Sequence, residues 1–286
     1  MIEAEAGWPR DRLDADYTAR DCVSAAEFAR IVGDYARLSA PARDLPGARL
    51  GLRHDPRSAE VLDLYGTAPG QARPCVMFIH GGYWRALSRA DSAFMAPMLA
   101  ARGIACAVPD YTLAPAVGIG EIVRQMRAAL AFLWHEAGAL GIDRARIVVA
   151  GSSAGGHLAA AVAMPGWQAG LGLPPGVPAA ALPVSGLFEL APLAACHVQD
   201  WMRFTPEEVA AFSPLRHVAG TAPTVVALAE GETPGFVRQS AAYAAALGGG
   251  ALTIPGRNHF DVILDLCDPG SALSRALLAL VDAPPP

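Results

Sequence analysis

Gly151-Ser152-Ser153-Ala154-Gly155-Gly156 is the stretch of sequence that decides the fold. It follows the apolar run 146–150 and precedes the helix-like run 157–164, which predicts a strand that turns sharply into a helix. In the Gly-x-Ser-x-Gly register of residues 151–155, small flanking residues let a strained turn present the Ser153 hydroxyl above a sheet. Ser153 is therefore the candidate nucleophile. The pentapeptide is a weak signal by itself, so the rest of the chain has to decide.

Length and composition favour one α/β domain. The 286 residues fit a single domain spanning 1–286. Hydrophobic residues make up 53% and charged residues 17% of the chain, which excludes a disordered protein. The longest apolar runs, such as 158–164 and 179–184, are far shorter than the ~20 residues of a membrane-spanning helix. With no secretory signal visible at the N-terminus, we expect a cytoplasmic protein that does not bind membranes.

Cysteine spacing and net charge narrow the expected partners. The five cysteines are dispersed and form no Cys-x-x-Cys pair, so we expect reduced thiols, mostly buried, and no metal site. A net charge of -5 without a basic cluster argues against nucleic acid as a partner. The remaining expectation is a protein that acts on a small molecule.

The hydrophobic pattern from residue 74 onward is apolar strands alternating with amphipathic helices. This pattern predicts a mostly parallel central sheet with helices on both faces. The expected strands are 75–79, 104–108, 146–150, 179–184, 224–229 and 251–254. The expected helices are 90–102, 119–140, 153–164, 235–247 and 271–281.

Three further segments flank or interrupt this pattern. Residues 1–45 are expected to form an N-terminal helical arm, whose helix at 24–38 carries apolar residues that we interpret as packing residues. Residues 48–54 and 59–65 read as a β-hairpin that opens the sheet. The proline-rich stretch 187–218 is expected to be a small lid or cap insertion.

A second motif, His80-Gly81-Gly82-Tyr83-Trp84, follows the expected strand 75–79. Paired glycines allow backbone N–H groups to approach a ligand closely, as an oxyanion hole requires. This position before the nucleophile is that of the oxyanion loop in α/β-hydrolases. We therefore expect Gly81 and Gly82 as donors, together with the N–H of Ala154, which follows the nucleophile.

The base is expected to be His259, which lies in the loop after the last apolar strand, the place of the histidine in an α/β-hydrolase. His157 is adjacent to the elbow but is expected to pack or to form a hydrogen bond. Chain order restricts the acid to the loop after strand 224–229. Glu232 is favoured there, and Glu230 is the alternative.

With these residues assembled, the chain resembles the arylformamidase (kynurenine formamidase) branch of the α/β-hydrolase superfamily, near the hormone-sensitive-lipase-like esterases. The matching segments extend over nearly the whole chain and include 13–17, 80–85, 110–115, 151–158, 185–190, 236–240 and 258–260. The resemblance implies Ser153 as nucleophile, His259 as base, and an acid at position 232, where the family usually has aspartate. Glutamate can still orient and stabilise an imidazolium.

The resemblance implies hydrolysis of N-formylkynurenine to kynurenine and formate through an acyl-enzyme, with no cofactor. Tyr83, Trp84 and Phe188 are the candidates to line a pocket for an aryl group. Two alternatives stay open. One is a carboxylesterase for short-chain or aryl esters with the same triad, and the other is a non-catalytic hydrolase-fold binder. A helical arm and exposed sheet edges would also suit a homodimer.

Overall fold

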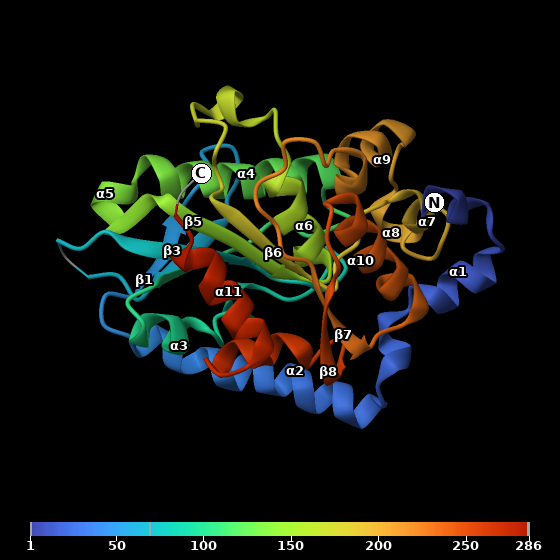
Figure 1. The fold of residues 1–286 in the computed structure, drawn as a ribbon, viewed down its shortest axis with the longest axis horizontal. Coiled ribbons are helices and arrows are strands. Elements are labelled where there is room, and N and C mark those ends of the chain that lie inside the picture. The colour runs from blue at the N-terminus through green and yellow to red at the C-terminus, as the bar shows by residue number, and fades with distance from the viewer. Residues whose placement is uncertain (1, 69, 285–286) are drawn as a thin grey trace.

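A computed structural model describes residues 2–68 and 70–284 of the chain. At its centre lies one eight-stranded sheet with the order β1-β2-β4-β3-β5-β6-β7-β8 (Figure 1). β1 and β4 pair with β2 in antiparallel fashion, and all other neighbours are parallel. The strands are β1 Arg49–Arg53, β2 Val61–Tyr65, β3 Arg73–Ile79, β4 Ala105–Pro109, β5 Ile142–Ser152, β6 Ala180–Val184, β7 Ala227–Gly231 and β8 Leu252–Asn258.

Helices cover both faces of this sheet, which confirms the predicted α/β-hydrolase fold (Figure 1). On β3, Cys75, Met77 and Ile79 pack toward α4 and α6, whereas Val76 and Phe78 pack toward α2, α3 and α11. This alternation is the period of two that a strand buried on both faces requires. The helices are α1 Arg10–Asp16, α2 Ala25–Ser39, α3 Ala96–Ala101, α4 Ile119–His135, α5 Ala137–Leu140, α6 Ala154–Ala163, α7 Ala191–Ala194, α8 Gln199–Met202, α9 Pro206–Phe212, α10 Pro234–Ala246 and α11 Ala272–Asp282.

Prolines account for two differences between the expected and observed elements. The helix expected at 90–102 is a 3-10 turn at Arg89–Asp91 followed by α3, in whose first turn Pro97 lies. The strand expected from residue 224 begins at Ala227. Thr224 forms only an isolated bridge with Ala181, because Pro183 of β6 has no N–H to continue the ladder from this bridge to the Val184–Ala227 pair.

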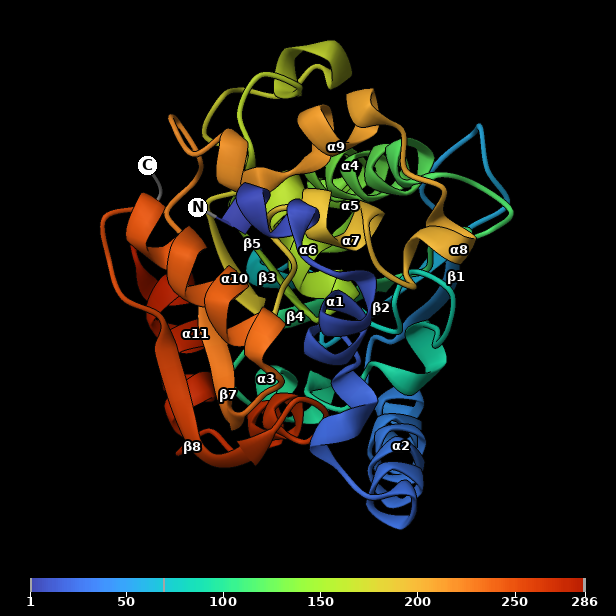
Figure 2. The same cartoon turned by 90° about the vertical axis from the view of Figure 1, so that its right-hand side faces the viewer.

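The N-terminal arm crosses the end of the sheet at which the parallel strands finish. α1 lies beside α10 and the α7–α9 segment, whereas α2 runs along the face of the sheet that α3 and α11 cover (Figures 1 and 2). Ion pairs hold the first part of the arm: Arg238 of α10 binds Glu5 and Asp16, and Arg10 binds Asp200 of α8. Within the described residues, none of the helices combines the length and apolarity needed for a membrane crossing.

Candidate active site

The turn between β5 and α6 presents Ser153 in a strained backbone conformation. Ser153 has φ 58° and ψ -119°, although it is not a glycine, and α6 begins at the next residue. Its N–H donates to the carbonyl of Val184 at the end of β6 (2.9 Å). Strain of this kind persists only where the surroundings enforce it, and it projects the side chain away from the sheet.

Gly151 and Gly155 enforce this turn because no larger residue fits at either position. A Cβ at Gly151 would lie 2.2 Å from the carbonyl oxygen of Gly155, and a Cβ at Gly155 would lie 2.0 Å from that of Ile79. Backbone atoms cannot yield as the end of a side chain can. The glycines of the 151–155 register are therefore steric requirements of the turn that carries Ser153.

Three side chains from separate elements form one hydrogen-bonded row. His259 Nε2 lies 3.0 Å from Ser153 Oγ, and His259 Nδ1 lies 2.6 Å from Glu232 Oε2. The Glu232 and His259 side chains are 0% and 2% exposed, so water hardly screens their pairing. Since a carboxylate only accepts, Nδ1 donates to Glu232 and Nε2 is left to accept the Ser153 proton. The structure thus brings together the residues expected as nucleophile, base and acid.

The structure distinguishes Glu232 from its alternative Glu230. The exposed carboxylate of Glu230 accepts from the N–H of Gly256 (2.8 Å), whereas the imidazole of His259 pairs with Glu232. Glu232 Oε1 accepts instead from the hydroxyl of Ser185 and more weakly from the N–H of Ala229 (3.4 Å). Ser185 is a residue that the sequence reasoning missed. It lies just after β6 with φ 51°, a left-handed conformation that the residues around it in the sequence do not predict.

The His80–Gly82 loop lies against the elbow. A Cβ at Gly81 would lie 2.8 Å from the carbonyl oxygen of Ser152, and Gly82 has φ +95° with the carbonyl of Ala86 only 2.4 Å from where a Cβ would stand. Both glycines line the pocket that contains Ser153. Ala154 is the first residue of α6, so its N–H has no acceptor within the helix. The expected oxyanion donors therefore gather around Ser153.

Tyr111 and His80 fix the path of this loop. The Tyr111 hydroxyl lies 3.2 Å from the carbonyl of His80 and 3.1 Å from that of Gly81, and its ring stacks on His80 with centroids 4.2 Å apart. Burial lowers the pKa of His80, so its imidazole is neutral near pH 7. Tyr111 was not singled out from the sequence, although it lies in the 110–115 segment that carried the family resemblance.

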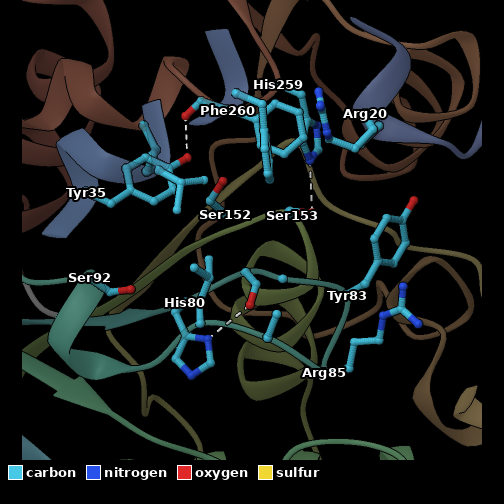
Figure 3. Close-up of a pocket in the computed structure, with 18 of the residues that line it drawn as sticks. Arg20, Tyr35, His80, Tyr83, Arg85, Ser92, Ser152, Ser153, His259 and Phe260 are labelled. Atoms are coloured by element: carbon cyan, nitrogen blue, oxygen red, sulfur yellow. Dashed lines mark hydrogen bonds between the residues drawn. The ribbon is translucent and has the colours of Figure 1, made fainter. Parts of the chain in front are cut away.

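The pocket beside Ser153 has a volume of about 390 Å³, within the range of small-molecule sites (Figure 3). The N-terminal arm supplies much of its wall through Arg20, Phe28, Val32 and Tyr35. Phe28 packs edge-on against Phe260, the neighbour of the base, at 4.9 Å between ring centroids. The packing expected from the helical spacing is confirmed at Ile31 and Tyr35, which lie in the core, but the same face of the arm also lines the pocket, which the spacing did not predict.

The aromatic residues expected in the pocket separate into two groups. Tyr83 lines the pocket, and its hydroxyl donates to the carbonyl of Tyr17. Trp84 and Phe188 do not line it, and this part of the prediction is wrong. Trp84 is 0% exposed and packs edge-on against His157, while Phe188 is 0% exposed and stacks on a tyrosine of α10 at 4.3 Å. Positive φ angles at Tyr83 (50°) and Trp84 (58°) turn the loop so that the two neighbouring side chains diverge.

Residues 187–218, the segment expected to be a lid, form α7, α8 and α9 but contribute no side chain to the pocket wall. Trp201 of this segment reaches the pocket only through a neighbour, donating to the carbonyl of Tyr83 (3.1 Å). The arm covers Ser153 instead. That residues 187–218 act as a lid or cap stays a prediction.

Among the described residues, one group offers three possible metal ligands within 4.8 Å of one another: Asp14, Cys196 and His197. They lie outside the pocket wall. His197 Nδ1 is 3.3 Å from Asp14, and the Cys196 thiol donates to the carbonyl of Leu193 (3.5 Å). None of these three residues takes part in the hydrogen bonds that join Ser153, His259 and Glu232.

Comparison with known proteins finds relatives along most of the chain. It is 30% identical to the kynurenine formamidase of Salmo salar over 253 residues, which cover 84% of each chain. It is 27% identical to the kynurenine formamidase of Danio rerio over 282 residues, 94% of this chain and 91% of the relative. The family model described as BD-FAE matches residues 62–171.

Solved structures agree in fold. A provisionally assigned thioesterase from Silicibacter sp. TM1040 superimposes with a TM-score of 0.79 and 29% identity over 95% of this chain and 99% of the other. An esterase from Pyrobaculum calidifontis gives a TM-score of 0.72 over 88% of this chain and 91% of the other, at 18% identity. At that identity the second likeness concerns the fold alone.

Proposed function

This chain belongs to the kynurenine formamidase family of α/β-hydrolases, and we propose that it hydrolyses the formamide bond of N-formylkynurenine to give kynurenine and formate. The observation that carries the proposal is the row from Ser153 through His259 to Glu232, at 3.0 and 2.6 Å, which opens into an apolar pocket. A serine held next to an imidazole that a carboxylate orients is the arrangement that acyl transfer requires.

In the proposed mechanism, Ser153 Oγ attacks the formyl carbon while His259 Nε2 takes the hydroxyl proton. Glu232 stabilises the resulting imidazolium through Nδ1. The backbone N–H groups of Gly82 and Ala154 donate to the oxygen that becomes negative, and the electrostatic benefit is largest in a site that excludes water. The carbon–nitrogen bond then breaks, and His259 gives its proton to the departing aryl amine.

Deacylation repeats the same steps with water. His259 removes a proton from a water molecule, which attacks the formyl ester of Ser153, and the proton returns to Ser153 Oγ as formate leaves. A formyl group is the smallest acyl group, so most of the pocket volume is left for the aryl amine. The apolar wall from Phe28, Val32 and Tyr35 fits such a leaving group.

Turnover of N-formylkynurenine measured beside p-nitrophenyl acetate and butyrate tests the proposal. We expect kynurenine release with a kcat/KM above that for either ester, and loss of all three activities in Ser153→Ala. Efficient ester cleavage without formamide cleavage would instead identify a carboxylesterase, the alternative that shares this triad. No turnover, together with no labelling of folded protein by a fluorophosphonate, would identify a binding protein.

Two expectations about the setting of the enzyme are also proposals. A cytoplasmic location is supported by the five free thiols, three of them buried, because reducing compartments keep cysteines unpaired. A homodimer is supported by the strand β1 at one edge of the sheet, on which Leu50 is 48% exposed. Sedimentation of the purified protein would test the second.

A further inference from the structure

The pocket around Ser153 carries an uneven distribution of charge. Among the described residues, its wall includes two arginines, Arg20 from the arm and Arg85 from the loop after the oxyanion glycines, and no aspartate or glutamate. The buried Glu232 behind His259 already accepts from His259 and Ser185. The chain as a whole has a net charge of -5, so this local excess of positive charge runs against the average of the molecule.

Both arginines are positioned by aromatic rings instead of by carboxylates. The Arg85 guanidinium carbon lies 3.7 Å from the ring centroid of Trp201, and that of Arg20 lies 4.1 Å from the ring centroid of Phe28. Arg20 also donates to the carbonyls of Val23 (3.2 Å) and Ser24 (3.4 Å). Neither has a carboxylate partner in the part of the chain that the structure describes.

Stacking of this kind leaves the edge of a guanidinium available to a ligand. The face of the group is occupied by the ring, while N–H donors along its edge can bind a carboxylate in the plane. In the view of Figure 3, Arg20 lies above Ser153 beside His259, Arg85 lies below it, and Tyr83 lies between the two arginines at the right. An anionic group on a substrate held in this pocket would therefore meet donors that are already oriented.

We propose that Arg20 and Arg85 are specificity residues that bind a carboxylate on the part of the substrate that departs from the acyl group. The substrate class is then an aryl formamide that carries a carboxylate. Because the pocket wall offers no acid, an ammonium group on the substrate contributes nothing to recognition. The formamide part of this statement rests on the proposed function, whereas the carboxylate part does not.

Three formamides separate these contributions in the wild-type enzyme: N-formylkynurenine, its analogue without the α-ammonium group, and ortho-formamidoacetophenone, which carries neither charge. We expect the ammonium-free carboxylate to be hydrolysed at least as well as N-formylkynurenine. The neutral ketone should have a kcat/KM lower by roughly tenfold or more, mostly through KM, as expected for loss of a charge-assisted hydrogen bond. Equal kcat/KM values for the neutral and anionic formamides would overturn the proposal.

Variants connect this selectivity to the two residues. Arg20→Gln and Arg85→Gln should each lower kcat/KM for both carboxylate substrates several-fold, the double variant should lower it further, and all should spare the neutral ketone. Arg85→Lys should retain part of the preference, because it keeps the charge but not the planar fork. Arg144→Gln is the matched control, since Arg144 stacks on Trp134 at 4.9 Å near the opposite end of β5 from Ser153. An equal loss on neutral and anionic substrates would mean a structural role and would contradict the proposal.

The same comparison with esters keeps the two proposals distinguishable. If no formamide is hydrolysed, para-acetoxybenzoate is compared with phenyl acetate in the wild type and in the Arg20→Gln/Arg85→Gln double variant. A wild-type preference for the anionic ester that disappears in the double variant would uphold the arginine pair while the formamidase function fails. The absence of any such preference would overturn the arginine pair as well.

Discussion

The elbow around Ser153 and the arm that covers it are built in contrasting ways. At the elbow, backbone atoms approach so closely that a Cβ at Gly155 would lie 2.0 Å from a carbonyl oxygen. On the arm, the pocket wall consists of side chains at helical spacing, Phe28, Val32 and Tyr35, of which Phe28 and Tyr35 contact Phe260 in the base loop. The elbow tolerates almost no substitution, whereas the arm can exchange one apolar side chain for another.

This difference separates the chemistry from the selectivity of the site. Rigid backbone packing fixes the positions of nucleophile and oxyanion donors, and these serve any acyl substrate. The segment that shapes the rest of the pocket lies over 100 residues earlier in the chain and can vary without disturbing the triad. Changes at the elbow should therefore abolish activity on all substrates, and changes in the arm should alter the preference among them.

The largest effect on the elbow side is expected from Glu232→Gln. Glutamine keeps the shape of the side chain but can no longer accept the Nδ1 proton as a carboxylate and stabilise the imidazolium. By the behaviour of other triads, kcat should fall by about 10³- to 10⁴-fold for formamides and esters alike. Steady-state kinetics on both substrate types measures it.

Glu230→Gln is the matched control, since its carboxylate is exposed and bonds only to the N–H of Gly256. It should leave kcat within about twofold of the wild type, because a surface hydrogen bond contributes little. If Glu230→Gln is the more damaging of the two substitutions, the acid has been assigned to the wrong residue.

Gly155→Ala should be the next most severe change, acting on stability as well as on activity. The added methyl collides with the carbonyls of Ile79 (2.0 Å) and His80 (2.6 Å), which belong to the sheet and the oxyanion loop. Overpacking of this kind should cost about 3 kcal/mol or more of the free energy of unfolding. Urea unfolding monitored by circular dichroism gives that number.

Gly170→Ala controls for the loss of a glycine as such. Gly170 lies in a surface turn, where a Cβ would meet no atom within 4 Å. The unfolding free energy of this variant should stay within about 0.5 kcal/mol of the wild type. Equal stability of the two alanine variants would show that the elbow backbone shifts to accommodate a methyl group. The elbow would then tolerate substitution as the arm does.

The sequence predicts the elbow well because its signals are local. The glycines flanking Ser153 directly indicate a tight turn that leaves no room for larger side chains. The alternation of strands and helices predicts the sheet at whose end this turn lies. His259 follows from chain order in the same way. Where a predicted element shifted, as at β7, the cause is a proline on the neighbouring strand, Pro183 of β6.

The pocket wall could not be predicted because its contacts connect distant segments. The spacing of Phe28, Val32 and Tyr35 shows that one face of a helix is covered, but not whether a core or a cavity covers it. Trp84 and Phe188 illustrate the converse: proximity in sequence to the loop or to a strand end suggested a role in the pocket, whereas both side chains are fully buried in the core. Ser185 escaped notice because its partner is 47 residues away.

Lowering the pH should reduce the contribution of the elbow side to the free energy of unfolding before it affects that of the arm. His157 of α6 is buried and donates to the carbonyl of Phe212 (2.8 Å), and burial lowers its pKa from 6.5 to about 4. In the unfolded chain this histidine becomes protonated as the pH falls below 6.5, whereas in the folded protein it becomes protonated only near pH 4. The free energy of unfolding therefore decreases as the pH falls through that window. Between pH 7 and pH 5 this contribution amounts to about 2 kcal/mol.

His157→Gln should remove this part of the pH dependence. The difference in unfolding free energy between pH 7 and pH 5, from urea titrations, should be smaller than in the wild type by about 2 kcal/mol. His54 and His80, whose pKa values burial also lowers, are present in both proteins and cancel. Tyr35→Phe is the comparison on the arm: burial raises the pKa of Tyr35, so its effect on stability should be the same at both pH values. An unchanged pH dependence in His157→Gln would contradict the assignment.

The smallest expected effect comes from a substitution that changes the arm alone. Phe28→Ala removes a half-buried ring from the pocket wall, where it packs on Phe260 and under Arg20. Loss of that contact should raise KM for N-formylkynurenine by roughly tenfold or less, in keeping with about 1 kcal/mol for an aromatic contact, while p-nitrophenyl acetate, too small to fill the wall, keeps its kcat/KM. Leu38→Ala is the matched control, since Leu38 packs on the core from the same helix but does not line the pocket. A parallel loss on both substrates in Phe28→Ala would mean that the arm supports the triad itself, and chemistry and selectivity would then not be separate in this fold.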